Sequence, residues 1–369
     1  MGALHREAHL KRCASFFFFK SLDLNYDYGY LKLLSYNYLK KMYIRKTEQI
    51  VFVQEISRLS LIINFDTTRM LKLNKFPFTA ILGWSASRYD KFKVCQRQYY
   101  YDYYAKNHDF EVEKKELLRL KQLTSVALEI GNIFHDVVKA ILERLVKSPI
   151  NIDRDKLKIW AKKLAIDYCN KKEFFEVYYK HLEEINTEEI SNTVLEYLDR
   201  LLDSERFKWI LDNAVQQSKD WMIEPDGFGE TRINGLKAYC KVDFLMPLGD
   251  KIYIFDWKTG KEDEIKQRKQ LAGYTSFACS HYGKTANDVI CILYFLKENK
   301  EKIVTFTPDE ILSFSESILT ETQEMYQFTN DINKNIPKSK ESFEKTIQTR
   351  ICDFCNYKGI CIDNEKIIF

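Results

Sequence analysis

Two aspartates and a lysine are the residues of this chain best suited to act together chemically. Asp256 and Lys258 follow residues 252–255, an apolar run that predicts a buried strand. Alternation along a strand places both of these side chains on one face. Asp243 lies 13 residues before Asp256, close enough for a short hairpin to bring it alongside. We therefore expect two carboxylates and an ammonium group to converge.

This trio predicts metal-assisted hydrolysis of a phosphodiester. Two unpaired carboxylates about 4 Å apart repel by roughly 4 kcal/mol at an effective dielectric near 20, so a proton or cation must lie between them. Their hard oxygen atoms favour Mg²⁺ or Mn²⁺. The ion would polarise a phosphodiester and activate water, while Lys258 would orient that water or balance the developing charge. A structural role for the trio remains open, because the acid-any-Lys pattern also starts at Glu113 and Glu298.

Three closely spaced cysteines form a second group, with Cys352 and Cys355 in a CxxC motif and Cys361 six residues later. Nine cysteines without a secretory signal indicate thiols or metal ligands in a reducing, cytoplasmic compartment. Three thiolates suit zinc or an iron-sulfur cluster, and a fourth ligand is needed. The other cysteines are expected to be core residues or bystanders; they are Cys13, Cys169, Cys240, Cys279 and Cys291.

The elements that must position these groups alternate between helices and strands. A helix over residues 87–104, capped by Ser85 or Ser87, would present Cys95 on its inner face. Another helix, over residues 125–145, has His135 near its middle. Further along the chain we expect two or three helices in residues 151–220, strands at 236–245 and 251–257 around a turn at 247–250, a helix at 266–282, strands at 289–296 and 302–307, and a helix at 308–328.

Changes in composition divide the chain into five segments. Residues 1–69 are either an added extension or a helical subdomain, and residues 70–150 carry the first helices. A helical insertion at 151–222 precedes a catalytic core at 223–334 and a tail at 335–369. A net charge of +4 neither requires nor excludes a nucleic-acid partner, so a DNA site must be identified from local groups of residues. No apolar run approaches the length of a membrane span, so we expect no membrane partner.

Five motifs, in this order, resemble the RecB-like nucleases, a branch of the PD-(D/E)XK superfamily that includes the AddB nuclease domain and the CRISPR-associated adaptation nucleases. The resemblance covers about residues 82–363. Its motifs are SASRYDKFKVCQRQYYYDYY at 85–104, GNIFH ending at His135, KVDF around Asp243, DWKTG from Asp256, and QLAGY from Gln270 to Tyr274. It implies an α/β fold with a restriction-endonuclease-like mixed central sheet flanked by helices.

The resemblance also implies roles for individual residues. His135 would join Asp243 and Asp256 at the metal, with the backbone carbonyl of Trp257 as a further ligand. Lys258 would be the catalytic lysine. Gln270 and Tyr274 would line the active-site groove, and their i, i+4 spacing does place them on one helix face. A further acidic ligand is expected at Glu224, with Glu230 as its rival.

For the cysteines, the resemblance supplies Cys95 as the fourth ligand of a [4Fe-4S] cluster with Cys352, Cys355 and Cys361. The sequence departs from the family pattern at Gln96, where a proline is common. Such a cluster would close a loop of more than 250 residues and thereby restrain the unfolded chain. We expect its role to be structural.

The predicted function is Mg²⁺-dependent DNA hydrolysis, exonucleolytic on single-stranded ends, in DNA repair, recombination or CRISPR adaptation. An endonuclease of a phage or mobile element and a non-catalytic iron-sulfur DNA-binding subunit are the alternatives. No Walker A loop is present, so a helicase or a CRISPR or recombination partner would act in trans. Interleaved aromatic and basic residues at 88–106 suit single-stranded DNA, or simply pack a helix.

Overall fold

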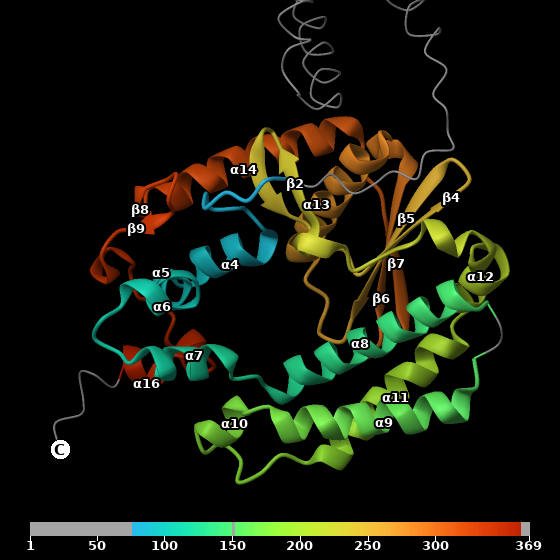
Figure 1. The fold of residues 1–369 in the computed structure, drawn as a ribbon, viewed down its shortest axis with the longest axis horizontal. Coiled ribbons are helices and arrows are strands. Elements are labelled where there is room, and N and C mark those ends of the chain that lie inside the picture. Colours follow the sequence, from blue (N-terminus) through green and yellow to red (C-terminus); the bar gives the residue numbers. More distant parts are fainter. Residues whose placement is uncertain (1–75, 150–151, 363–369) are drawn as a thin grey trace, which may run out of the picture. The chain divides into compact units, whose positions relative to one another are not determined.

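A five-stranded mixed sheet of order β1-β4-β5-β6-β7 forms the centre of the fold (Figure 1). The computed structural model describes residues 76–149 and 152–362, all within the unit Leu71–Phe369, so the predicted extension at 1–69 lies outside the described residues. β5 pairs in parallel with β6, and the other neighbours are antiparallel. The five strands are β1 (Met222–Ile223), β4 (Phe244–Leu248), β5 (Lys251–Lys258), β6 (Val289–Phe295) and β7 (Lys300–Val304).

Side chains alternate across the sheet, which has an apolar core on each face. Phe255 and Trp257 pack into the core that includes the apolar face of α8 (Val126–Lys147). Ile252 and Ile254 pack into the opposite core, which includes α13 (Glu264–Tyr282). Asp256 and Lys258 continue the series of Ile252 and Ile254, so the period of two directs them toward α13.

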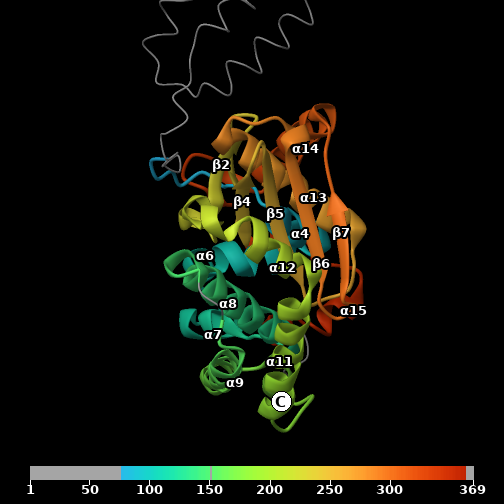
Figure 2. The same ribbon diagram turned by 90° about the vertical axis from the view of Figure 1, so that its right-hand side faces the viewer.

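The helix predicted at 125–145 is confirmed as α8, which starts after the N-cap Ser125 and ends before Ser148. α8 contacts α9 and α11, and the three helices lie together beside the sheet (Figures 1 and 2). The remaining helices are α4 (Ala86–Val94), α5 (Gln96–Tyr100), α6 (Lys106–His108), α7 (Lys114–Gln122), α9 (Arg154–Lys171), α10 (Phe175–Tyr178), α11 (Thr187–Asp203), α12 (Glu205–Asn213), α14 (Pro308–Tyr326), α15 (Thr349–Cys352) and α16 (Lys358–Cys361). None of the helices in the described part of the chain is long and apolar enough to cross a membrane.

The single helix predicted at 87–104 is wrong at Cys95. This residue has an extended backbone, with φ −159° and ψ 110°, and separates α4 from α5. Its Sγ accepts a hydrogen bond from the backbone N–H of Gln98 at 3.4 Å, so Cys95 caps the second helix. The backbone N–H of Arg97 donates to Glu344 at 3.0 Å. A contact with the distant tail therefore accompanies the break, and a π-helical turn, Tyr101–Ala105, follows α5.

The strand predicted at 236–245 is also wrong, because two strands of different sheets occupy it. β3 (Leu236–Tyr239) pairs with β2 (Glu230–Ile233) in a separate two-stranded sheet, and β4 begins at Phe244. The intervening backbone makes other hydrogen bonds, from Cys240 to Gly229 at 3.0 Å and from Glu224 to Asp243 at 3.1 Å. The strand expected at 302–307 is β7, which starts and ends earlier than expected.

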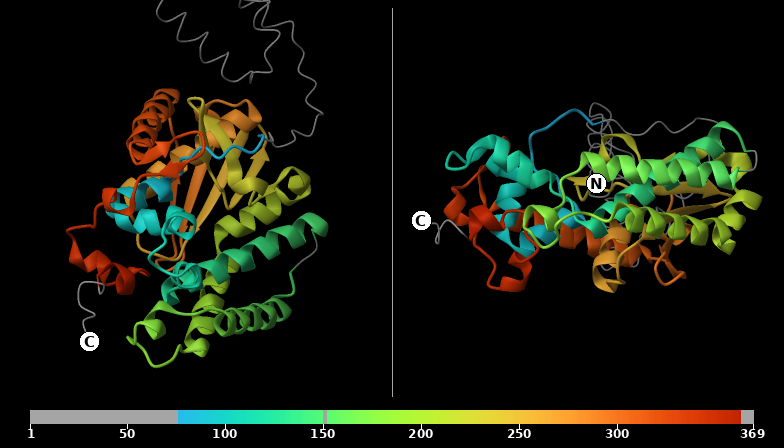
Figure 3. Two further views of the ribbon diagram at one scale, coloured as in Figure 1. Left: turned by 60° about the vertical axis from the view of Figure 1, so that its left-hand side comes forward. Right: turned by 90° about the horizontal axis from the view of Figure 1, so that it is seen from below.

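The tail lies beside the early helices α4 to α7, although more than 200 residues separate them in the chain (Figure 3). Its ordered elements include a short hairpin of β8 (Thr329–Asp331) and β9 (Ile336–Pro337), followed by α15 and α16. Phe343, which is fully buried, packs against Tyr100 with ring centroids 5.1 Å apart. This packing brings the cysteines of the tail back toward Cys95.

Candidate active site

A chain of polar contacts connects the end of β5 to α13. Lys258 Nζ lies 2.6 Å from Asp256 Oδ2 and donates a hydrogen bond to Gln270 Oε1 at 2.8 Å. Gln270 Nε2 donates in turn to the Tyr274 hydroxyl at 2.6 Å. Asp256 is 2% exposed and Tyr274 5%, so the contacts are formed largely out of water. The predicted pairing of Lys258 with Asp256 on one strand face, and of Gln270 with Tyr274 on one helix face, is therefore observed.

Asp243 and His135 meet on the other side of Asp256. Asp243 directly precedes β4, and its Oδ2 lies 3.3 Å from His135 Nδ1 of α8. Gly131 allows the helix to approach, because a Cβ at this position would lie 3.1 Å from Thr259 Oγ1, just beyond β5. The glycine of the GNIFH motif therefore helps to set the position of His135 against the sheet.

Burial and charge perturb both of these groups. Burial, followed by the negative charge of Asp256, raises the pKa of Asp243 well above its usual range. Burial lowers the pKa of His135, although Asp256 and a backbone hydrogen bond with Trp257 act in the opposite direction. Near neutral pH, His135 is thus favoured as a neutral imidazole, which is the form that binds metals.

The donor atoms at this site fit a hard divalent cation. Asp243 Oδ2 and Asp256 Oδ2 are buried and lie in ion-pair contact with His135 and Lys258 rather than in well-oriented hydrogen bonds, and the backbone of Trp257 contacts His135. Within residues 76–149 and 152–362, the structure contains no group of three or more His, Cys, Asp or Glu side chains that is already arranged to bind a metal ion. Instead Lys258 and His135 lie against the two carboxylates. Carboxylate oxygens and an imidazole are nevertheless a ligand set of the kind that Mg²⁺ and Mn²⁺ accept.

Glu224, rather than Glu230, lies next to Asp243. Glu224 has a φ of +42°, a strained conformation for a non-glycine residue, and its carboxylate lies 3.1 Å from Lys139 Nζ and 3.2 Å from Lys241 Nζ. Burial raises its pKa, but hydrogen bonds and charge from the two lysines outweigh burial and hold it below its ordinary value. Glu230 lies on β2, where it pairs with Arg232 at 2.8 Å.

A cavity of about 380 Å³ opens beside these residues. Its walls include residues that sequence reasoning did not select, on α8, at the end of α9 and before β4. The spacing of Glu129, Asn132 and Asp136, three polar residues within the apolar first half of the helix, was the available signal. The full lining is Glu129, Asn132, His135, Asp136, Tyr168, Lys172, Glu224, Lys241 and Asp243.

The four cysteines that the resemblance singled out lie close enough for their charges to affect one another. Each is a free, partly buried thiol. Burial raises the pKa of Cys355 to about 12, with smaller contributions from Cys95, Cys361 and Cys352. Burial likewise raises the pKa of Cys352 and of Cys361, and Cys95 adds to both shifts. These mutual effects indicate that Cys95 and the tail cysteines are neighbours, although they do not form a preorganised metal site within the described residues.

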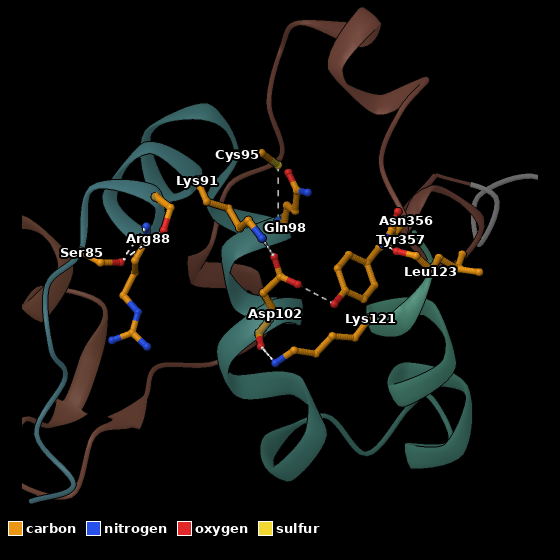
Figure 4. Close-up of polar contacts among 11 residues, drawn as sticks. Ser85, Arg88, Lys91, Cys95, Gln98, Asp102, Lys121, Leu123, Asn356 and Tyr357 are labelled. Carbon is orange, nitrogen blue, oxygen red and sulfur yellow. Dashed lines mark hydrogen bonds and ion pairs between the residues drawn. The ribbon is translucent and has the colours of Figure 1, made fainter. Parts of the chain in front are cut away.

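Asp102 fastens the cysteine-bearing tail to the early helices (Figure 4). Its Oδ1 accepts a hydrogen bond from the Tyr357 hydroxyl at 2.8 Å, and Lys91 forms an ion pair with its other oxygen. Its backbone carbonyl accepts from Lys121 Nζ at 2.6 Å. Tyr357 also stacks on Tyr101, with ring centroids 5.0 Å apart. These contacts hold the segment between Cys355 and Cys361 against the early helices.

Most aromatic side chains at 88–106 pack the interior, as the second interpretation of this segment predicts. Tyr99, Tyr100 and Tyr104 are each no more than 3% exposed. Tyr103 is 37% exposed, and the guanidinium of Arg88 lies 4.3 Å from the centre of its ring. Stacking of DNA bases along the whole segment is thus not supported by its burial.

Comparison with known proteins gives one match that covers most of the chain. A family model described as "PD-(D/E)XK nuclease superfamily" matches residues 83–362. No curated protein matches the chain. Among solved structures, that of SSO0001 is similar at 15% sequence identity and a TM-score of 0.24, over 51% of this chain and 78% of that chain.

Proposed function

This chain belongs to the PD-(D/E)XK nuclease superfamily, and from this membership we propose that it is a metal-dependent DNA nuclease with its centre at His135, Asp243, Asp256 and Lys258. One observation carries the proposal. Lys258 is held between Asp256 and Gln270, while the partly buried Asp243 carboxylate contacts His135 within the same site. A pair of acids, one of them fully buried, beside an ordered lysine is costly to maintain for stability alone.

The metal ligands would be Asp243, Asp256, His135 and the backbone carbonyl of Trp257, with Glu224 as a further acidic ligand. When bound, Mg²⁺ or Mn²⁺ supplies polarisation of the phosphodiester and a lowered pKa of bound water. Burial of Asp256, which is 2% exposed, limits the access of competing water molecules and strengthens the attraction of its carboxylate for a cation.

Lys258 would orient the attacking water or balance charge on the phosphate. Its position does not rest on Asp256 alone, because Gln270 accepts one of its hydrogen bonds and Tyr274 fixes Gln270. Groups fixed in advance of the reaction lose little conformational freedom when the transition state forms. Gln270 and Tyr274 are therefore proposed to act through Lys258.

The substrate is proposed to be DNA with a free single-stranded end, cleaved exonucleolytically in repair, recombination or CRISPR adaptation. The helicase or recombination partner would be supplied by another chain. Exposed cations near the site, such as Lys172 and Lys241, support contact with a phosphate backbone.

Cys95, Cys352, Cys355 and Cys361 are proposed to hold a [4Fe-4S] cluster of structural role. The proposal is supported by the proximity of the four thiols and by the Asp102 network that positions the tail. Anaerobically purified protein should absorb broadly near about 400 nm. A colourless protein that contains stoichiometric zinc would refute the cluster.

The nuclease proposal is tested with end-labelled single-stranded, duplex and circular DNA in Mg²⁺ or Mn²⁺. We expect linear single strands to be shortened from an end, and Asp256→Ala and Lys258→Ala to abolish this. The exposed turn residue Asp250, substituted by Ala, serves as a control that retains activity. Cleavage of circles would favour an endonuclease, and DNA binding without any cleavage would favour a non-catalytic subunit.

A further inference from the structure

The cavity beside the candidate centre is large enough for more than a metal ion. Its volume of about 380 Å³ falls within the range of small-organic-ligand sites, about 300 to 1,000 Å³. It is an order of magnitude larger than the ~30 Å³ that one water molecule occupies in the liquid. His135, Asp243 and Glu224 line it, so it is continuous with the centre. A ligand in this cavity would lie next to the phosphate that reacts.

Glu129 provides an unused hydrogen-bond acceptor in the cavity lining. The residue is 0% exposed, and its Oε2 accepts from Thr124 Oγ1 at 2.8 Å and from Asn132 Nδ2 at 3.2 Å. Its Oε1 is buried and accepts no hydrogen bond. Buried acceptors without a donor are uncommon and costly. A ligand that reaches this oxygen must therefore present a donor.

The other walls suit a flat, donor-bearing group. Asp136 accepts a hydrogen bond from the Tyr168 hydroxyl, which orients the Tyr168 ring at the edge of the cavity. Aromatic rings of this kind stack on unpaired bases. Lys172 is exposed and forms no recorded ion pair within the described part of the chain, so it remains available to a phosphate.

We propose that this cavity receives the base next to the cleaved phosphate, and that Glu129 selects cytosine and adenine over thymine. The inference rests on the proposed function, because it assigns a nucleotide to the same centre. Cytosine N4 and adenine N6 are amino groups that can donate to a carboxylate. Thymine presents O4 at the corresponding edge, which would place two acceptors against each other.

The experiment uses end-labelled single-stranded oligonucleotides that differ only in the terminal nucleotide and its neighbour at each end. Competition between them gives ratios of kcat/KM, and equilibrium binding to the Asp256→Asn variant gives ratios of Kd. We expect the wild type to favour dC over dT by about tenfold, the size of one good base contact. Equal treatment of all four bases in both measurements would overturn the inference.

Glu129→Gln makes the test specific. The amide keeps an oxygen for Thr124 and Asn132 but replaces Oε1 with an N–H donor, so the dC-to-dT ratio should fall to one or below. Glu143→Gln, the same change at an exposed position of α8 outside the cavity, should keep the wild-type ratio. An unchanged ratio in Glu129→Gln contradicts a role for Glu129.

A second variant keeps the inference testable if Glu129→Gln does not fold. Tyr168→Ala should weaken binding of all four bases by about tenfold, because it removes the stacking surface. Unaltered binding by this variant would contradict a base in the cavity. Absence of cleavage for every oligonucleotide would count against the nuclease proposal instead, while the binding ratios would still decide the base preference.

Discussion

Asp243→Asn is expected to stabilise the metal-free protein. Burial and the Asp256 charge raise the pKa of Asp243 in the folded state. Above the ordinary aspartate pKa of about 3.9, the folded state therefore binds more protons than the unfolded state, and stability falls as pH rises through the folded pKa. The Asp243→Asn variant does not lose stability in this way, because asparagine does not titrate. His135 offers little compensation, because burial lowers its pKa and keeps it largely neutral near pH 7.

The size of the effect follows from the charges that meet at the site. Two charges about 4 Å apart repel by roughly 4 kcal/mol at an effective dielectric near 20, and the Lys258 ammonium 2.6 Å from Asp256 offsets part of this. A net gain of about 1 to 3 kcal/mol for Asp243→Asn should raise the unfolding temperature by roughly 2 to 6 °C. The gain should shrink as pH is lowered toward about 4.

Thermal unfolding in metal-free buffer and in a Mg²⁺ titration measures both parts of the argument. Mg²⁺ at about 100 times its Kd should stabilise the wild type by about 2.7 kcal/mol, and Asp243→Asn much less. Asp250→Asn, an identical change in the exposed turn between β4 and β5, should follow the wild type in both conditions. The reasoning is refuted if metal-free Asp243→Asn unfolds at a lower temperature than the wild type, or if Mg²⁺ stabilises the two equally.

Three further outcomes are expected. Lys258→Met should lower kcat by a factor of about 10² to 10³, measured by single-turnover cleavage, and should leave the Kd for DNA, measured by fluorescence anisotropy, within a few-fold of the wild type. A change in Kd alone would contradict a role of Lys258 in the reaction. Tyr274→Phe leaves Gln270 Nε2 without its acceptor. The variant should therefore lose about 1 to 3 kcal/mol of unfolding free energy in chemical denaturation, and its kcat should fall. A loss of stability with an unchanged kcat would show that Tyr274 does not act through Lys258. Cys355→Ser should eliminate the absorbance at about 400 nm and lower the unfolding temperature by about 5 °C. If neither the absorbance nor the unfolding temperature changes, the protein does not hold a cluster at Cys355.

The strand of Asp256 and the helix of His135 could be predicted because their signals are local. An apolar run fixes β5, and a serine cap with a 3.6-residue period fixes α8. The approach of Asp243 to Asp256 follows from the short β4-β5 hairpin. These features need no knowledge of distant parts of the chain.

The breaks at Cys95 and before Asp243 could not be predicted, because distant backbone groups stabilise them. Arg97 donates to Glu344, and Cys240 donates to Gly229, partners that no local pattern identifies. Both breaks occur beside candidate ligands, Cys95 and Asp243. At functional sites the backbone often departs from the regular helix or strand that the local sequence pattern predicts. Glu224 was the expected further acid, but no local pattern indicated that Lys139 and Lys241 would form ion pairs with its carboxylate.

The cavity walls were missed for a related reason. Glu129 and Asp136 occupy polar positions of an amphipathic helix, where the default expectation is a solvated face. Packing of α9 against α8 brings Tyr168 and Lys172 to the cavity that Glu129 also lines. Sequence spacing can select such residues, but it cannot tell an enclosed carboxylate from a solvated one.

The central claim is that one centre, built around Asp243, Asp256 and Lys258, hydrolyses DNA with the help of a divalent cation. Its most direct test is the rate of nucleotide release from end-labelled single-stranded DNA by the wild type and Asp256→Ala, with Mg²⁺ and with a chelator. We predict release by the wild type in Mg²⁺ alone, and none by Asp256→Ala in either condition. Equal release by Asp256→Ala, or release that persists in the chelator, would contradict the assignment.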